Sequence, residues 1–576
     1  MNRPRHRLYL VITLLSPVLL FGLAELALRA IGAGTLEPLF VPVEQAPGYL
    51  QPNPQVVQRF FPDPSQAPEV SVDTTWFPAA KAPGTLRIFV QGASSAAGFP
   101  YGRWASPAAL LQQRLQRAYP DREIEIINTA MAAVTSYALL DFADEIIEQQ
   151  PDAVVIYAGH NEYLGIGGVG SSLVSARSPT LGRAVARLRR LHLYHGFERL
   201  VGRLAPAPEL LPDHGGTLMA RVAAERSIPL GSPLYGQGIE QFRGNLSRLL
   251  ETYREAGVPV FIGTLASNER GQPPFADTPP AGGGAAAAET FARARELERQ
   301  RDYAAAREAY RAARDLDGLR FRAPSEFNRV IRAAAEHSGA IVVDVEAALA
   351  AASAHGIIGE ELMLEHVHPN VAGYFELASS FYAPLVDWLG QSPVSVDDDT
   401  ARAEIPVTEV DRLHGEYRMA MLKNDWPFVA ERRPTELPAP GNRIEEIAQQ
   451  WFLGRITWVE AMNQALAAYQ QAGNLEESAR VAVNLAEAFV NADDVQHAAG
   501  RLLLRAGQPE RALRYLQRAV RLNGQPIEYW LNVAQAQYGL GRRDESIATL
   551  ERVLEEHPGE ERASYWLEVI RREAGP

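Results

Sequence analysis

From residue 85 onward, the sequence alternates between short apolar segments and longer amphipathic ones. The short segments are typical of buried parallel strands; they are Leu86–Gln91, Ile124–Asn128, Ala153–Tyr157, Val258–Gly263 and Ala340–Val345. Helical patterns separate them, over Pro107–Ala118, Tyr137–Gln150, Gly238–Ala256 and Pro324–Ser338. This alternation predicts βαβ units, and so an α/β domain over residues 85–390 with a parallel sheet between layers of helices.

Two inserts interrupt the alternation. Residues 165–233 begin rich in Gly and Ser and continue into a basic helical pattern at Arg183–Arg203. So long an excursion after a strand end is typical of a lid, and the basic pattern is either a solvated helix face or a helix on an acidic membrane surface. Residues 285–320 have small and aromatic residues at helical spacing between Tyr303 and Ala313, which predicts a helical hairpin.

The N-terminus has the pattern of a membrane signal anchor. The basic segment Arg3–Arg7 precedes 17 uncharged residues, Leu8–Ala24. This run is near the lower limit for a membrane-spanning helix and longer than the core of a typical signal peptide. We therefore expect a transmembrane helix within residues 1–30, with a cleaved signal peptide as the alternative. The basic flank would stay in the cytoplasm, which places the remainder in the periplasm of a bacterium, attached to its inner membrane by a single pass.

Two segments have the composition of connectors. Residues 31–84 are rich in proline and lack periodicity, apart from one candidate edge strand near Val70–Phe77. Residues 391–440 contain the acidic run Asp397–Asp399 and three prolines between Pro434 and Pro440, and we expect a linker there.

The C-terminal region, residues 441–576, repeats with a period of 34. The period is carried by Gly473, Gly507 and Gly541, each followed five residues later by a small residue, at Ser478, Ala512 and Ser546. This is the period of a helix–turn–helix solenoid, and the pattern resembles tetratricopeptide repeats. The resemblance implies an all-α region that binds a protein or peptide partner, with buttressing of the α/β domain as the alternative role.

Four polar segments lie at strand ends or before a helix. They are Gly92–Ser95 after the first strand, Asn128–Thr135 after the second, Gly159–Glu162 after the third and Glu365–Asn370 before the last helix of the domain. Because the carboxyl ends of parallel strands meet at one edge of a sheet, we expect these segments to converge. Together they supply a hydroxyl, an imidazole, a carboxylate and a carboxamide, which are the groups that acyl transfer needs.

The spacing of these groups predicts their roles. Ser94 is the candidate nucleophile, and His368 is the base that takes its proton. Glu365, three residues upstream, can accept from the other ring nitrogen of His368. The Asn161 side-chain amide and a backbone N–H of the second segment can stabilise the oxyanion. The alternatives are Ser95 as nucleophile and His366 as base, each adjacent to or near the favoured residue.

These four blocks resemble the SGNH, or GDSL, hydrolase family over residues 85–389 without the inserts. The resemblance implies a flavodoxin-like SGNH sheet, hydrolysis of ester or O-acyl groups, and no required metal or cofactor. It assigns the nucleophile to Ser94, the oxyanion asparagine to Asn161 and the base to His368. This sequence departs from the family pattern at three positions: Ala93 replaces an Asp, Ala133 replaces the glycine that donates its N–H to the oxyanion, and Glu365 replaces the Asp of D-x-x-H.

Composition narrows the function further. The net charge of −13 argues against a nucleic-acid binder, and the lack of cysteine excludes disulfides and thiolate metal sites. We therefore expect a membrane-anchored, extracytoplasmic serine hydrolase acting on an acyl ester or an O-acylated glycan. Two alternatives remain. One is an O-acyltransferase of envelope polysaccharide, because a sugar hydroxyl can resolve the same acyl-enzyme. The other is a catalytically degenerate repeat scaffold, given the three departures.

Overall fold

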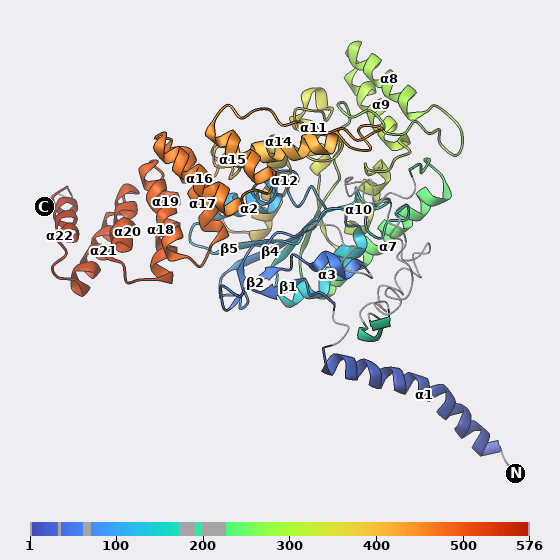
Figure 1. Cartoon of the computed structure of the whole chain (residues 1–576), viewed down its shortest axis with the longest axis horizontal. Helices are drawn as coiled ribbons and strands as arrows, with labels where there is room; N and C mark the ends of the chain where they lie inside the picture. Colours follow the sequence, from blue (N-terminus) through green and yellow to red (C-terminus); the bar gives the residue numbers. More distant parts are fainter. Residues whose placement is uncertain are drawn as a thin grey trace.

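The computed structural model describes residues 3–32, 36–61, 71–171, 191–194, 196–197 and 226–573. An α/β body carries an arm of helices that leads to the C-terminus, and a single helix leads to the N-terminus, so that the two termini lie at opposite ends of the molecule (Figure 1). Most of the expected lid, residues 165–233, lies outside the described residues.

Five parallel strands form the central sheet, in the order β5-β4-β6-β7-β8. Their bounds are Leu86–Gly92 for β4, Ile124–Asn128 for β5, Ala153–Tyr157 for β6, Val260–Gly263 for β7 and Ile341–Val343 for β8. Strands β4 and β6 are buried along their whole length, which explains their almost continuous apolar sequence. The predicted α/β fold with a parallel sheet is therefore confirmed.

Helices pack in two groups around this sheet. One group is α3 (Ser136–Glu148), α7 (Pro233–Glu255) and α10 (Ser325–Ser338); the other is α2 (Pro107–Ala118), α11 (Val345–Ala352) and α12 (Val371–Leu389) (Figure 1). Side-chain caps fix where two of them begin. Ser106 accepts from the N–H of Ala109 at 3.2 Å, and Asn370 accepts from the N–H of Gly373 at 2.9 Å. The second cap sets the start of α12 directly after the segment that contains His368.

The expected connector over residues 31–84 contains a small antiparallel sheet instead. Its strands are β1 (Phe40–Pro42), β2 (Tyr49–Pro52) and β3 (Phe77–Pro78), and a short 3-10 helix spans Val56–Phe60. The rings of Phe40 and Phe77 contact that of Phe89 in β4, with centroids 5.6 and 6.0 Å apart. This small sheet therefore belongs to the core of the α/β body.

Helix α1 (Arg3–Ala30) covers the segment expected to be a membrane anchor. In the part of the chain that the structure describes, no helix is both long and apolar enough to cross a membrane. The structure thus does not support the predicted transmembrane helix.

The second insert forms the predicted helical hairpin, made of α8 (Ala287–Arg299) and α9 (Tyr303–Leu316). The apolar contact between the two helices includes Phe291, Ala306 and Tyr310, which are all buried. The hairpin projects from the α/β body on the side away from the N-terminal helix (Figure 1).

The segment expected to be a linker, residues 391–440, contains two helices, α13 (Asp398–Ala403) and α14 (Glu409–Lys423). A capping box at Thr408 starts α14. Val410, Leu413 and Tyr417 of α14 share an apolar cluster with the first helices of the C-terminal arm. The helical arm therefore begins with α14, and the acidic and proline-rich flanks of this segment concealed an amphipathic helix.

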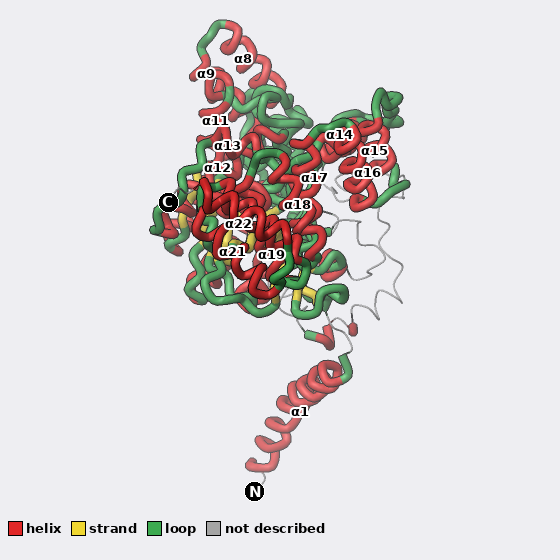
Figure 2. The backbone as a smooth tube through the Cα atoms, turned by 90° about the vertical axis from the view of Figure 1, so that its left-hand side faces the viewer, coloured by secondary structure: helices red, strands yellow, loops and turns green. Residues whose placement is uncertain are grey.

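Eight further helices complete the arm. They are α15 (Arg443–Phe452), α16 (Trp458–Gln471), α17 (Leu475–Ala488), α18 (Asp493–Arg505), α19 (Pro509–Leu522), α20 (Ile527–Gly539), α21 (Arg543–Glu556) and α22 (Glu561–Glu573). The glycines of the 34-residue period end the first helix of a pair with φ of 70 to 74°, and the small residues five positions later are completely buried between helices. Seen along the arm, the later helices lie stacked in front of the α/β body (Figure 2).

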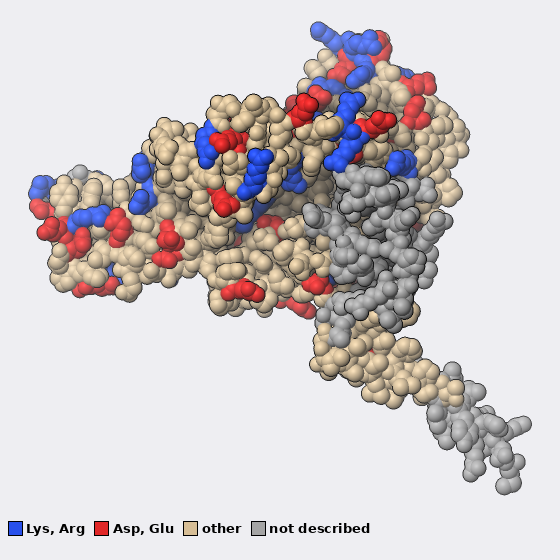
Figure 3. Space-filling model, in the orientation of Figure 1, with Lys and Arg blue, Asp and Glu red and all other residues tan. Residues whose placement is uncertain are grey.

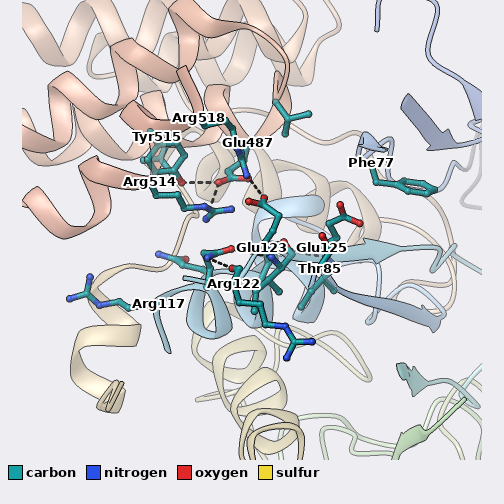
Figure 4. Close-up of a pocket in the computed structure, with 18 of the residues that line it drawn as sticks. Phe77, Thr85, Arg117, Arg122, Glu123, Glu125, Glu487, Arg514, Tyr515 and Arg518 are labelled. Atoms are coloured by element: carbon teal, nitrogen blue, oxygen red, sulfur yellow. Dashed lines mark hydrogen bonds and ion pairs between the residues drawn. The ribbon is translucent and has the colours of Figure 1, made fainter. Parts of the chain in front are cut away.

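The arm meets the β5 edge of the sheet across a cavity of about 830 Å³ (Figure 4). Arg518 of α19 pairs with Glu123 at 2.7 Å, and Tyr515 donates to Glu487 of α17 at 2.8 Å. Although burial alone would raise it, Arg514 and Arg518 lower the pKa of Glu487 to about 2. Ion pairs thus hold the repeats against the sheet at this cavity. On the face of the molecule drawn in Figure 3, acidic and basic residues are interspersed.

Side-chain amides from α2 bond three of the outward backbone groups of edge strand β5. The Gln112 amide donates to the carbonyl of Ile124 at 2.5 Å and accepts from the N–H of Ile126 at 2.7 Å. Gln116 accepts from the N–H of Ile124 at 3.3 Å. The amides therefore make the hydrogen bonds that a further strand would make.

Gly92, the last residue of β4, lies so close to β6 that replacement by alanine should destabilise the fold. An added Cβ would lie 2.4 Å from the Tyr157 carbonyl oxygen and 2.4 Å from the Cβ of Ala96. We expect Gly92→Ala to lower the free energy of unfolding by about 1–3 kcal/mol, measured by urea denaturation. Gly236→Ala is the matched control, because its Cβ would point into open space on a helix. An unchanged midpoint for Gly92→Ala would contradict this close approach.

Candidate active site

The turn after β4 presents Ser94 at the carboxyl end of the sheet. The N–H of Phe99 donates to the Ser94 carbonyl at 3.0 Å, which closes the turn. The hydroxyl of Ser94 is partly exposed and lies 2.7 Å from Nε2 of His368. A serine in hydrogen-bond contact with an imidazole has the geometry of an activated nucleophile.

The segment before α12 holds His368 in place. Oε1 of Glu365 accepts from the backbone N–H of His368 at 2.8 Å and also contacts Nδ1 of its ring. This carboxylate fixes the ring orientation and leaves Nε2 free to accept the serine proton. The structure thus brings Ser94, His368 and Glu365 together in that order, and the longer glutamate side chain reaches Nδ1 as an aspartate would.

The alternative nucleophile and base lie in different environments. Ser95 is buried and donates to the Val367 carbonyl at 3.1 Å, which ties the nucleophile turn to the segment that contains the base. The ring of His366 is buried between aromatic side chains, with the rings of Phe275 and Phe428 5.3 and 5.6 Å away, and contacts the second oxygen of Glu365. Neither residue is placed to react with a substrate at Ser94.

Backbone hydrogen bonds join the second polar segment to the nucleophile turn. The N–H of Met131 donates to the Gly92 carbonyl at 3.1 Å, and the Asn128 side chain donates to the Ala96 carbonyl at 3.0 Å. Ala133 has φ of 62°, a left-handed conformation that glycine adopts easily. The substitution therefore retains the backbone geometry at a small steric cost.

Asn161 lies beside Ala133. A Cβ added to Gly165 would approach both the Ala133 carbonyl oxygen, at 2.5 Å, and the Cβ of Asn161, at 2.8 Å. The Asn161 amide nitrogen is buried and has no acceptor in the described part of the chain. This donor is therefore available to an oxyanion formed at Ser94.

The neighbours of Asn161 have structural roles. Glu162 is completely buried and accepts from Ser136 and Gln241, which links the end of β6 to α3 and α7. His160 accepts from the N–H of Ala323 at 3.1 Å through Nδ1. Within the described ranges, no group of three His, Asp or Glu side chains is arranged to hold a metal ion.

One wall of the site comes from a segment that sequence analysis assigned to the linker. Arg418 of α14 lies over the ring of Phe99, 4.7 Å from its centroid, and donates through Nη1 to the Pro100 carbonyl at 3.0 Å. The Phe99 ring in turn packs against His368 with centroids 4.6 Å apart. No motif marks Arg418, and sequence reasoning missed it because its position depends on how α14 packs.

Burial keeps the imidazoles of the site neutral. It lowers the pKa of His368 to about 3, with a smaller contribution from Arg418, and it lowers the pKa of His160 to about 3. Burial also lowers the pKa of His366 well below its ordinary value. A neutral His368 has a lone pair on Nε2 that can accept the serine proton, and the Glu365 carboxyl lies against its Nδ1.

Comparisons with known proteins agree with parts of this description. The tetratricopeptide repeat family model matches residues 497–561, which confirms the repeat prediction for that stretch. No curated protein matches the chain.

Among solved structures, two esterases are similar over about half of the chain. Axe2, an acetylxylan esterase from Geobacillus stearothermophilus, is 16% identical, with 52% of this chain and 94% of that chain covered and a TM-score of 0.28. Esterase EstA from Pseudoalteromonas sp. is 13% identical. The match covers 53% of this chain and 99% of EstA, with a TM-score of 0.27. The second tetratricopeptide domain of human RPAP3, solved with an HSP70 peptide, is 19% identical. The match covers 19% of this chain and 92% of the RPAP3 domain, with a TM-score of 0.18.

The three buried imidazoles of the candidate site make stability depend on pH. Their folded pKa values lie below that of an unfolded histidine, near 6.5, so the unfolded chain binds more protons in acid. Their contribution to stability is complete above pH 6.5 and is lost as the pH falls toward 3. We expect the free energy of unfolding to drop by about 1 kcal/mol per imidazole per pH unit below pH 6.

Urea denaturation between pH 7 and pH 5 measures this slope. His557→Gln is the control, because His557 is exposed and its loss should leave the slope unchanged. A wild-type protein equally stable at pH 7 and pH 5 would contradict the burial of these rings.

Proposed function

We propose that this protein is a serine hydrolase of the SGNH type that cleaves an ester or O-acyl group through an acyl-enzyme. The observation that carries the proposal is the 2.7 Å contact between the Ser94 hydroxyl and Nε2 of His368, whose Nδ1 contacts Glu365. The unpaired amide of Asn161 supports it by supplying a donor for the oxyanion.

The proposed reaction follows from these positions. Ser94 attacks the acyl carbon while His368 takes its proton, and Glu365 stabilises the resulting imidazolium. The Asn161 amide and the N–H of Ala133 donate to the tetrahedral oxyanion. The backbone N–H of Ser94, which sequence reasoning did not single out, is a further donor, because neither it nor that of Ala133 has an acceptor among the described residues.

The intermediate then collapses in two balanced steps. The imidazolium of His368 returns the proton to the leaving alcohol, and the acyl group stays bonded to the Ser94 oxygen. Water next attacks the acyl-enzyme while His368 again accepts a proton, which it passes to Ser94 as the carboxylic acid leaves. A sugar hydroxyl in place of this water would give acyl transfer.

The three departures from the family pattern do not favour an inert scaffold. Ala133 adopts the left-handed conformation of the glycine it replaces, and the Glu365 carboxylate contacts the base. Ala93 replaces a side chain that takes no part in the chemistry proposed here. Each reacting group is therefore present in this chain.

Replacement of Ser94 tests the proposal directly. We expect Ser94→Ala to lose hydrolysis of 4-nitrophenyl acetate by about 10⁴-fold or more and to lose labelling by a fluorophosphonate probe, because the probe reacts with an activated serine. Ser95→Ala is the matched control and should retain labelling. Labelling that persists in Ser94→Ala would refute the assignment, and acylated glycan among the products would indicate transfer rather than hydrolysis.

Two further roles are proposals of their own. We propose that the chain is exported to the periplasm, which the basic N-terminal residues ahead of an uncharged run support. We also propose that the repeats bind a protein partner, which the tetratricopeptide match and the exposed Tyr565 and Trp566 of α22 support.

Crosslinking in intact bacterial cells followed by fractionation tests both roles. The protein should be found in the envelope fraction, and a discrete crosslinked species should weaken when Tyr565 and Trp566 are replaced by alanine. Recovery in the cytoplasmic fraction would contradict export. A crosslinked species of unchanged intensity in the double variant would contradict binding through α22.

A further inference from the structure

Arg418 is a partly exposed cation that has no carboxylate partner among the described residues. Burial lowers the pKa of its guanidinium, because desolvation disfavours the charged form. In the described part of the chain, its one hydrogen bond goes to the carbonyl of Pro100. Of the five buried arginines in the described part of the chain, Arg320 donates to two backbone carbonyls and the other four pair with a carboxylate: Arg59, Arg87, Arg314 and Arg322. A partly desolvated cation without a counter-ion is costly, and Arg418, unlike Arg320, lies against the ring that packs on His368.

One edge of the Arg418 guanidinium is free. Nη1 donates to Pro100, whereas Nε and Nη2, which share the other edge, have no hydrogen-bond partner among the described residues. This edge is the one that binds a carboxylate through two parallel hydrogen bonds.

Arg418 also lies close to the reacting groups. Its guanidinium is 4.7 Å from the centroid of the Phe99 ring, and that ring is 4.6 Å from the ring of His368. Arg418, Phe99 and Ser94 are all partly exposed, and Phe99 closes the turn of Ser94 through its N–H, which donates to the Ser94 carbonyl at 3.0 Å. A substrate whose acyl carbon meets Ser94 can therefore reach the free edge of Arg418 with another part of the same molecule.

We propose that Arg418 binds a carboxylate of the substrate, and that the natural substrate is an ester or O-acyl compound that carries a carboxylate near the scissile bond. This inference rests on the proposed function. A carboxylate fits better than a phosphate dianion, because a single guanidinium edge is free, and one such edge matches one planar monoanion.

Matched ester pairs test the inference. One pair places the carboxylate on the alcohol side, 4-acetoxybenzoate against methyl 4-acetoxybenzoate. The other places it on the acyl side, monophenyl adipate against phenyl hexanoate. The kcat and KM of the full-length protein are measured for all four esters, and the ratio of kcat/KM within each pair gives the preference for the charged ester.

We expect the wild-type protein to prefer the charged ester in at least one pair. Arg418→Gln should reduce that preference about tenfold or more, mainly by raising KM for the charged ester. Arg418→Lys should keep part of the preference, because it retains the charge but not the two parallel hydrogen bonds. Arg412→Gln is the control, since Arg412 is on the same helix and pairs with Glu409 and Glu416; it should leave both ratios unchanged.

The outcomes separate the two proposals. If the wild-type protein hydrolyses the esters without preferring a charged one, or if Arg418→Gln remains active with both ratios unchanged, the role of Arg418 is overturned and the hydrolase proposal stands. If none of the four esters is hydrolysed and Ser94 does not react with a fluorophosphonate, the proposed function fails, and this inference fails with it.

Discussion

The contact between the Ser94 hydroxyl and the His368 ring is the interaction on which the functional reading depends, and it joins residues 274 positions apart in the chain. The fold supplies it in two parts. Strand β4 lies between β5 and β6, so the turn that carries Ser94 is flanked by the loops that carry Ala133 and Asn161. Helix α12 packs against α2 and brings the segment with His368 to the same end of the sheet. Neither part alone would place a base beside the serine.

Local sequence patterns predicted the elements that build this arrangement. The apolar segments gave the five strands to within three residues at each end, because a parallel strand buried on both faces leaves a continuous apolar signature. The four polar segments were identified for a related reason, since strand ends in a parallel sheet converge whatever the details of packing. The 34-residue period predicted the repeats, because small residues recur wherever two helices approach closely.

Features that depend on packing between distant segments could not be read in this way. Strands β1 to β3 are two to four residues long, too short for a periodic pattern, and the Phe77 ring that joins them to β4 carries no local signal. Helix α14 lies between an acidic run and several prolines, so composition indicated a linker although the helix borders the candidate active site. The position of Arg418 beside the site depends on its contact with the Phe99 ring, which no local pattern predicts.

The amide of Gln112 has a consequence for the behaviour of the whole molecule. An edge strand with unpaired backbone groups is a template onto which another chain can add, and such addition leads to aggregation. In this protein the outward backbone groups of Ile124 and the N–H of Ile126 in β5 are already bonded to Gln112 and Gln116, and the opposite edge strand, β8, spans only three residues. Strand addition at β5 would therefore first have to break the bonds that α2 makes to Ile124 and Ile126, which disfavours self-association through this edge of the sheet.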